Sequence, residues 1–140
     1  MPAQITSTTK DAVHKSESHK LHDAYTVKAA VTVTKGQLVK LDSATGHIEP
    51  AAAGEANINV IGVAVMDGVA GDVVTVMTKG FAIIWAEAEG AVVCGAVKAG
   101  TGMGTNYQQV DDTTVADADA IGWALDNVAD TEECRVLLSA

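Results

Sequence analysis

The sequence predicts an all-β protein, folded as a compact barrel or sandwich-like domain. Short runs of Val, Ile and Thr, which strands favour, recur along the chain. Turn signals separate these runs at intervals of roughly 8–12 residues, as in barrels and sandwiches. Aromatic residues make up only 4% of the 140 residues, so Val, Ile, Leu and Ala must form most of the core.

Composition excludes several classes of protein. An apolar content of 48% is too high for a disordered chain, and the length suits one domain. The net charge of −9 argues against binding to nucleic acid or to an anionic membrane, because both select a basic surface. The longest apolar run, 60–66, is too short to span a membrane. The N-terminus lacks the pattern of a signal peptide.

Residues 1–28 are polar and are predicted to form an extended arm ahead of a single β domain at 29–140. The arm holds four Lys, three acidic residues and three of the four His, whereas the rest of the chain carries five basic and fifteen acidic residues. Its few apolar residues show no periodicity, so it cannot offset its own ordering entropy. We expect a partner to be needed to order it.

Alternation and turn residues place the strands of the first half. The run 31–34 alternates apolar and polar residues, as a strand with one buried face does. The run 59–66 is apolar on both faces and is predicted to be central and buried. In order, the predicted strands are 31–34, 36–41, 47–49, 59–66, 73–78 and 81–85.

The second half repeats the pattern of the first. Gly36-Gln-Leu-Val-Lys40 and Ile61-Gly-Val-Ala64 have counterparts in Gly95-Ala-Val-Lys98 and Ile121-Gly-Trp-Ala124. The two glycines of each half are 26 and 27 residues apart. The spacing predicts two similar β units, at about 31–86 and 95–138. The Ala-rich run 115–128 also has helical spacing, but the repeat favours a strand there.

No pattern of side chains indicates a catalytic or metal site. His14, His19 and His22 lack a completing ligand and are predicted to be solvated, with a pH-sensitive contact as the functional alternative. The run 100–104 has the wrong glycine spacing for a dinucleotide loop. The acidic pair Glu87 and Glu89 lies in a turn context, and the other acidic clusters do not match a calcium loop. We therefore predict no metal, no cofactor and no enzymatic activity.

Several apolar and sulfur-containing residues are candidate core positions. Cys94 and Cys134 are predicted to be small buried hydrophobic residues. Trp85 and Trp123 are predicted to pack inside their respective halves, with a role as interface anchors as the alternative. The further predicted anchors are Ile61, Val63 and Ile121.

Residues 31–86 contain four segments that form one pattern: Gly36-Gln-Leu-Val-Lys-Leu-Asp42, Ile48-Glu-Pro-Ala51, Val60-Ile-Gly-Val-Ala64 and Gly71-Asp-Val-Val-Thr-Val76, with a fainter echo in 95–138. The resemblance of this pattern is to the small capsid decoration proteins of tailed bacteriophages, also called cement or head-auxiliary proteins. It implies a barrel or β-tulip domain that binds the outside of an assembled capsid and stabilises it. The protein would then belong to the virion exterior, after synthesis in the host cytoplasm.

The resemblance also implies partners. The major capsid protein would be the first, and many members of the family associate as homotrimers. An arm that orders on the shell is common in the family, and here its contacts would come from Ile5, Val13, His14, His19, Leu21, His22 and Tyr25. The long arm and the acidic second half depart from the minimal family pattern.

Two other classes of function remain open. One is a receptor- or carbohydrate-binding β module of a phage head fibre or a surface protein, although few aromatic residues are available to line a sugar site. The other is an enzyme or a carrier domain modified at Lys79, but the usual motif around such a lysine is missing.

Overall fold

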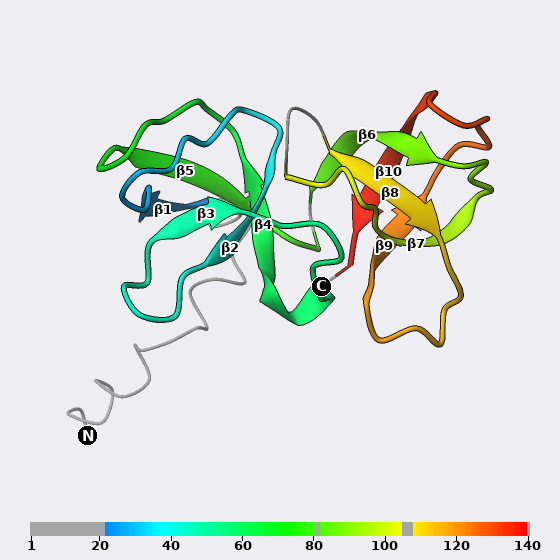
Figure 1. The fold of residues 1–140 in the computed structure, drawn as a ribbon, viewed down its shortest axis with the longest axis horizontal. Helices are drawn as coiled ribbons and strands as arrows, with labels where there is room; N and C mark the ends of the chain where they lie inside the picture. The colour runs from blue at the N-terminus through cyan, green and yellow to red at the C-terminus, as the bar shows by residue number, and fades with distance from the viewer. Residues whose placement is uncertain (1–21, 81, 105–107, 140) are drawn as a thin grey trace, which may run out of the picture.

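The computed structural model describes residues 22–80, 82–104 and 108–139. Over these ranges the protein is all-β, with ten strands and one short 3-10 helix (Figure 1). The elements are β1 (His22–Thr26), β2 (Leu38–Leu41), β3 (Ile48–Pro50), η3 (Asn57–Asn59), β4 (Val60–Ala64), β5 (Val73–Thr78), β6 (Ile83–Glu89), β7 (Gly95–Ala99), β8 (Gln109–Asp112), β9 (Ala120–Ala124) and β10 (Glu133–Leu138). Among the described residues, no helix has the length and apolar character that crossing a membrane requires.

The first unit is a five-stranded sheet in the order β1-β5-β4-β2-β3, and its strand pairs are antiparallel. β4 lies at its centre, as the apolar run at 59–66 predicts. The sheet curls until Val27, just after β1, forms a parallel bridge with Ile48 of β3. The amide of Lys28 donates to the carbonyl of Ile48 at 2.9 Å, so the two edges of the sheet meet there.

The second unit is a closed barrel in the order β10-β6-β8-β7-β9. β6 and β8 are parallel and the other pairs are antiparallel. Small and medium side chains fill the narrow interior of five strands, among them Ala86, Ala88, Val97 and Ile121. The Ala-rich run 115–128 contains strand β9, in agreement with the repeat.

The two units share one topology. Strands β1 to β5 correspond in order to β6 to β10, and corresponding strands have corresponding neighbours. The bridge from Val27 to Ile48 in the first unit takes the place of the β6–β8 pair in the second. The units run from β1 to β5 and from β6 to β10, whereas the sequence spacing placed them at 31–86 and 95–138. The boundary differs because β6 pairs with β10 and β8, so it belongs to the second unit.

The predicted strand at 31–34 is wrong. Val33 forms a single bridge to Gly68 and is fully buried, but its neighbours pair with no strand. The segment is therefore an extended loop that contributes one side chain to the core. Alternation alone could not distinguish this from a strand, because one inward side chain between two outward ones gives the same pattern.

The segment 22–28, assigned from composition to the arm, belongs to the folded unit. His22–Thr26 pairs with β5, and Val27 is 1% exposed. Backbone pairing requires no apolar side-chain pattern, so the polar composition concealed this strand. The remaining predicted arm contacts lie outside the described residues: Ile5, Val13, His14, His19 and Leu21.

Two hydrophobic clusters hold the protein together. The smaller fills the first unit and contains Val27, Val33, Val39, Ile48, Ala64, Val74 and Val76. The larger fills the barrel and extends onto the first unit through Leu38, Ala51, Val60 and Val63. Because side chains alternate along a strand, Leu38 and Val63 face away from the core of their own unit and pack against the barrel.

Backbone contacts fix the packing of both units at one equivalent position. Gly62 and Gly122 are the third residues of β4 and β9, where a Cβ atom would overlap a carbonyl oxygen of the next strand. The oxygen belongs to Met77 in the first unit and to Leu137 in the second. Glycine is thus required by close approach of the strands rather than by a turn.

Candidate interaction surface

Alternation in β6 and β10 directs a set of large side chains outward. Ile84 and Ala86 point into the barrel, so Ile83 and Trp85 point to solvent and are 57% and 62% exposed. On the neighbouring strand, Arg135 lies opposite Trp85, and Leu137 lies opposite Ile83. Directly opposite residues share a face of the sheet and contact one another.

The same surface continues onto β9. Trp123 lies opposite Leu137 and is 44% exposed. Leu125 follows β9, and its amide donates to the carbonyl of Arg135 at 2.8 Å. We define the tryptophan face by these two adjoining rows on the outside of the barrel: Ile83, Leu137 and Trp123 in one, and Trp85, Arg135 and Leu125 in the other.

The charge on the tryptophan face is neutralised by one pair. Arg135 donates from Nη2 to Asp126 Oδ1 at 2.8 Å and from Nε to Asp126 Oδ2 at 3.1 Å. The Arg135 backbone amide donates to the same carboxylate at 2.9 Å. The guanidinium contacts lower the pKa of the Asp126 carboxyl to about 2, and the pKa of Arg135 is raised in turn. The pair therefore adds no net charge to the face.

Two hollows flank this face. The first, of about 430 Å³, opens beside Ile83 and Trp85 and is bounded on the first unit by Val63 and Gln37. The second, of about 200 Å³, lies beside Trp123 and is bounded by Val115 and Asn57. Val115 is 84% exposed, so apolar surface continues past the edge of the barrel. An apolar sheet face between two hollows is suited to burial against a protein surface.

The structure separates the five predicted anchors. Ile121 and Val63 are buried, and Ile61 is partly buried against the smaller cluster. The prediction that Trp85 and Trp123 pack inside their halves is wrong, because both point outward. The interior of a five-stranded barrel is too narrow for a tryptophan beside its other side chains. Tyr25, predicted as an arm contact, lies in β1 and packs against the smaller cluster.

The two cysteines also differ from expectation. Cys134 is fully buried, as predicted, but Cys94 is exposed, and both are free thiols. Burial, followed by the nearby Asp126 carboxylate, raises the pKa of the Cys134 thiol. The Cys94 amide donates to Asn127 Oδ1 at 2.7 Å, which fixes the start of β7.

The acidic pair considered for catalysis serves to hold a loop. Glu89 accepts hydrogen bonds from the amide and the hydroxyl of Thr101, and Gln109 donates to Glu87 at 3.5 Å. These contacts attach the loop after β7 to β6. In the part of the chain that the structure describes, no three His, Cys, Asp or Glu residues gather as metal ligands.

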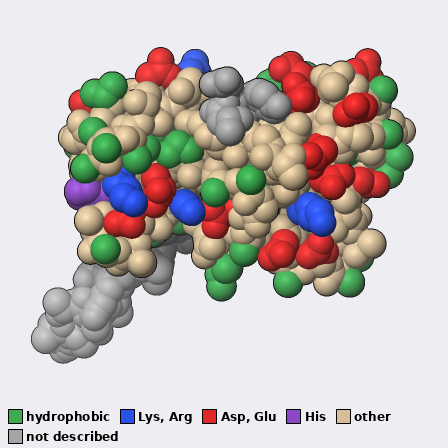
Figure 2. All heavy atoms as spheres, viewed as in Figure 1, with side chains coloured by type: hydrophobic (Ala, Val, Ile, Leu, Met, Phe, Trp, Pro, Cys, Tyr) green, Lys and Arg blue, Asp and Glu red, His purple; other side chains and the backbone are tan. Residues whose placement is uncertain are grey.

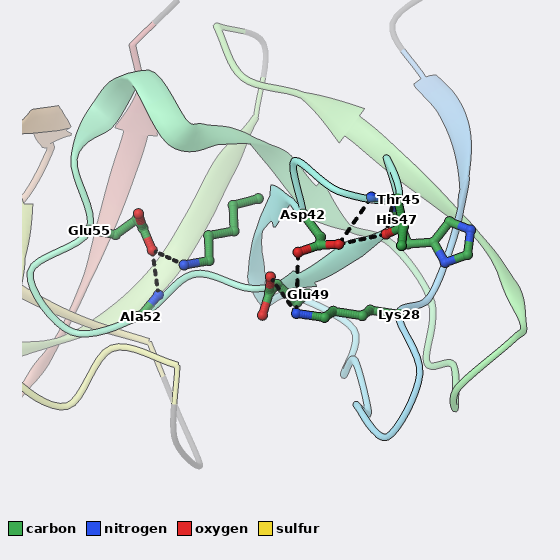
Figure 3. A network of polar contacts seen from close by, with 8 residues as sticks. Lys28, Asp42, Thr45, His47, Glu49, Ala52 and Glu55 are labelled. Atoms are coloured by element: carbon green, nitrogen blue, oxygen red, sulfur yellow. Dashed lines mark hydrogen bonds and ion pairs between the residues drawn. The ribbon is translucent and has the colours of Figure 1, made fainter.

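A polar network joins the edges of the first sheet (Figure 3). Lys28 Nζ lies 3.3 Å from Asp42 Oδ1 and 3.4 Å from Glu49 Oε2. Asp42 also accepts from the amide and the hydroxyl of Thr45, at 3.1 and 2.7 Å. Hydrogen bonds from Thr45 and then Lys28 lower the pKa of Asp42, and Asp42 and then Glu49 raise the pKa of Lys28. The side chain of His47 points away from these carboxylates and takes no part in the network. The network holds the two edges of the sheet together.

A second charged group anchors the loop before β4. Glu55 is 8% exposed and accepts from Lys40 Nζ at 2.8 Å, from the Ala52 amide at 3.0 Å and from the Asn59 side chain at 2.7 Å. Burial alone would raise the pKa of Glu55, but these hydrogen bonds outweigh it and lower the pKa. A charged carboxylate with three donors holds this loop in one conformation.

Comparison with known proteins finds a shared fold and no shared sequence family. No family model matches the chain, and no curated protein matches it. Among solved structures, the head fiber gp8.5 N base of bacteriophage phi29 matches with a TM-score of 0.55 and 19% sequence identity. The match covers 84% of this chain and 94% of that one. Because it covers most of both chains, both five-stranded units contribute to the likeness.

Proposed function

We propose that this chain is a structural protein of a tailed-phage head, bound to the outside of the assembled shell. The observation that carries the proposal is the fold match to the phi29 head fiber base over 84% of the chain. The sequence patterns of residues 36–76 support it independently, because they resemble capsid decoration proteins.

The distribution of charge fits a protein attached at one end and solvated at the other. Residues 82–139 hold ten acidic and two basic residues, whereas residues 22–80 hold six acidic and four basic residues. Figure 2 shows the acidic side chains gathered over the half formed by β6–β10. We place the shell at the N-terminal unit, which leaves the strongly acidic barrel in solvent, where like charges on neighbouring copies keep the particle soluble.

Stabilisation of the shell follows from mass action. A protein that binds the assembled shell and not its free subunits shifts the assembly equilibrium toward the shell. Because a shell offers many equivalent sites, a small contribution at each accumulates over the particle. The major capsid protein is the proposed partner, and residues 1–21 are the proposed attachment segment.

The test is co-sedimentation with phage heads that lack their own exterior proteins. We expect saturable binding at a fixed ratio to the major shell protein, and a higher temperature of DNA release from decorated heads. Binding that never saturates, or that is equal for heads and for unassembled shell subunits, would overturn the proposal.

A second candidate function is the base of a head fibre that carries a receptor-binding part. It is favoured by the fold match, because the matching structure is a head fiber base. The two candidates differ in effect: a fibre base binds heads without raising the temperature of DNA release. Heat challenge of decorated and bare heads therefore distinguishes them.

A further inference from the structure

The row of the tryptophan face that contains Trp123 has a counterpart in the first unit, and there that row is covered. Val63 lies opposite Met77 in the first unit, as Trp123 lies opposite Leu137 in the second. Leu38 pairs with Val63 as Ala96 pairs with Trp123. In the first unit this outer face packs against the barrel, with Leu38 and Val63 only 0% and 6% exposed.

In the second unit the same face carries larger apolar side chains and stays open. Trp123 takes the position that Val63 has in the first unit. Trp85 takes the position of Ala24, because Trp85 lies opposite Arg135 as Ala24 lies opposite the equivalent residue, Thr75. No segment among the described residues covers Trp85 or Trp123, as their exposure shows. The fold thus buries the row of Val63 within the chain and presents the equivalent row of Trp123 to solvent, whereas Ala24 and Trp85 are exposed in both units.

The exposed area suits a second copy with the same face. If a whole Trp side chain offers about 250 Å², the exposed fractions of 62% and 44% amount to roughly 250 Å² for the two tryptophans. Ile83 and Leu125, at 57% and 37% exposed, bring the face to roughly 450 Å² per copy. Two such faces bury about 900 Å², close to the roughly 1,000 Å² of a small specific interface.

Charge does not oppose a contact at this face between like copies. Two chains of net charge −9 repel over most of their surfaces, most strongly at the acidic barrel. On the tryptophan face, Arg135 is paired with Asp126 of its own chain, so two such faces meet without opposing net charges. A basic partner would instead be drawn to the acidic loops around the face.

We infer that the tryptophan face binds the tryptophan face of a second copy of this chain. This inference concerns the free protein and does not depend on the proposed function. It assigns to the outward rows of β6, β9 and β10 a role in self-association, with Trp85 and Trp123 as the central side chains.

Sedimentation equilibrium of the full chain without phage heads tests this inference. We expect a monomer at about 1 µM and a dimer at about 500 µM, as a weak interface of this size predicts. Trp85→Ser combined with Trp123→Ser is expected to weaken association by about 100-fold. Val73→Ser is the matched control, because Val73 is also 62% exposed but lies on β5, outside the face.

Tryptophan fluorescence gives a second readout, since both tryptophans of the chain lie on the face. We expect the emission to shift to longer wavelength on dilution, as the indoles return to water. Circular dichroism checks that the double variant is folded. A wild-type monomer at all concentrations, or equal association of the double variant and wild type, would overturn the inference. The inference would also be overturned if the wild type were monomeric and the double variant no longer bound phage heads. That result would assign the face to the shell.

Discussion

Asp126 couples the stability of the barrel to pH through its contacts with Arg135. The pair lowers the pKa of the Asp126 carboxyl from 3.8 to about 2. Because the pKa is lower in the folded chain than in the unfolded one, the pair stabilises the fold fully above the ordinary value. That contribution is lost as the pH falls through about 2.

Asp126→Asn is therefore expected to lower the thermal unfolding midpoint near neutral pH. The difference from wild type should shrink from about pH 4 downward and vanish below about pH 2, where the wild-type carboxyl is also uncharged. Thermal melts of both proteins at stepped pH measure this difference. A difference that stays constant down to the lowest pH would contradict the assigned charge pair.

Thr131 occupies a backbone conformation that branched residues avoid. Its φ is +69°, and Gly71, at the equivalent position of the first unit, has a φ of +88°. The amide of Thr131 donates to Ala88, as that of Gly71 donates to Val27. Thr131→Gly is expected to raise the free energy of unfolding by about 1 kcal/mol, measured by urea denaturation. A decrease would show that the threonine side chain contributes more than the strain costs.

At the level of the strand, Gly62 and Gly122 have the same function in the two units. Gly62→Ala and Gly122→Ala are each expected to lower the free energy of unfolding by more than about 2 kcal/mol, since the methyl group would displace a paired strand. Gly36→Ala is the control, because it has a φ of +89° but open space around it, and should cost about 1 kcal/mol. Urea denaturation of the three variants measures the order. Equal losses would contradict the close approach.

The strands that could be predicted from sequence are those with a strong side-chain signal. β4 and β5 come from runs of branched residues, and β9 follows from its likeness to β4. β1 could not be predicted, because it is held by backbone pairing to β5 and its residues are mostly polar. The all-β class was therefore predictable, but the register and the boundary between the two units were not.

The outward orientation of Trp85 was predictable from the alternation of side chains along β6, although tryptophan is a residue type usually expected to be buried. Ala86 and Ala88 alternate with Glu87 and Glu89 along β6, and the charged residues must face solvent. Trp85 stands at the same parity as the glutamates, so it faces outward. The tendency of tryptophan to be buried is weaker than the alternation of its strand. Trp123 had no such neighbours, and only the pairing of β9 with β10 places it.

On the scale of the whole molecule, every strand of the two described units lies within residues 22–138. The strands of the described residues begin with β1 at His22 and end with β10 at Leu138. Deleting 1–21 is expected to leave the thermal midpoint unchanged and to abolish binding to phage heads. Calorimetry and co-sedimentation measure the two effects. A truncated chain that binds heads with unchanged affinity would contradict the proposed attachment segment.

The shared topology of the two units has a consequence for how the chain refolds. In a newly collapsed chain, a strand has two possible pairing partners of the same shape, one in each unit. This is because β5 and β10 each complete a unit by pairing with an equivalent neighbour. Exchanged pairings are therefore near in geometry to the correct ones. Mismatched side chains, such as Trp85 where Ala24 should lie, penalise the exchange. Sequence divergence between the two halves thus protects the folding pathway.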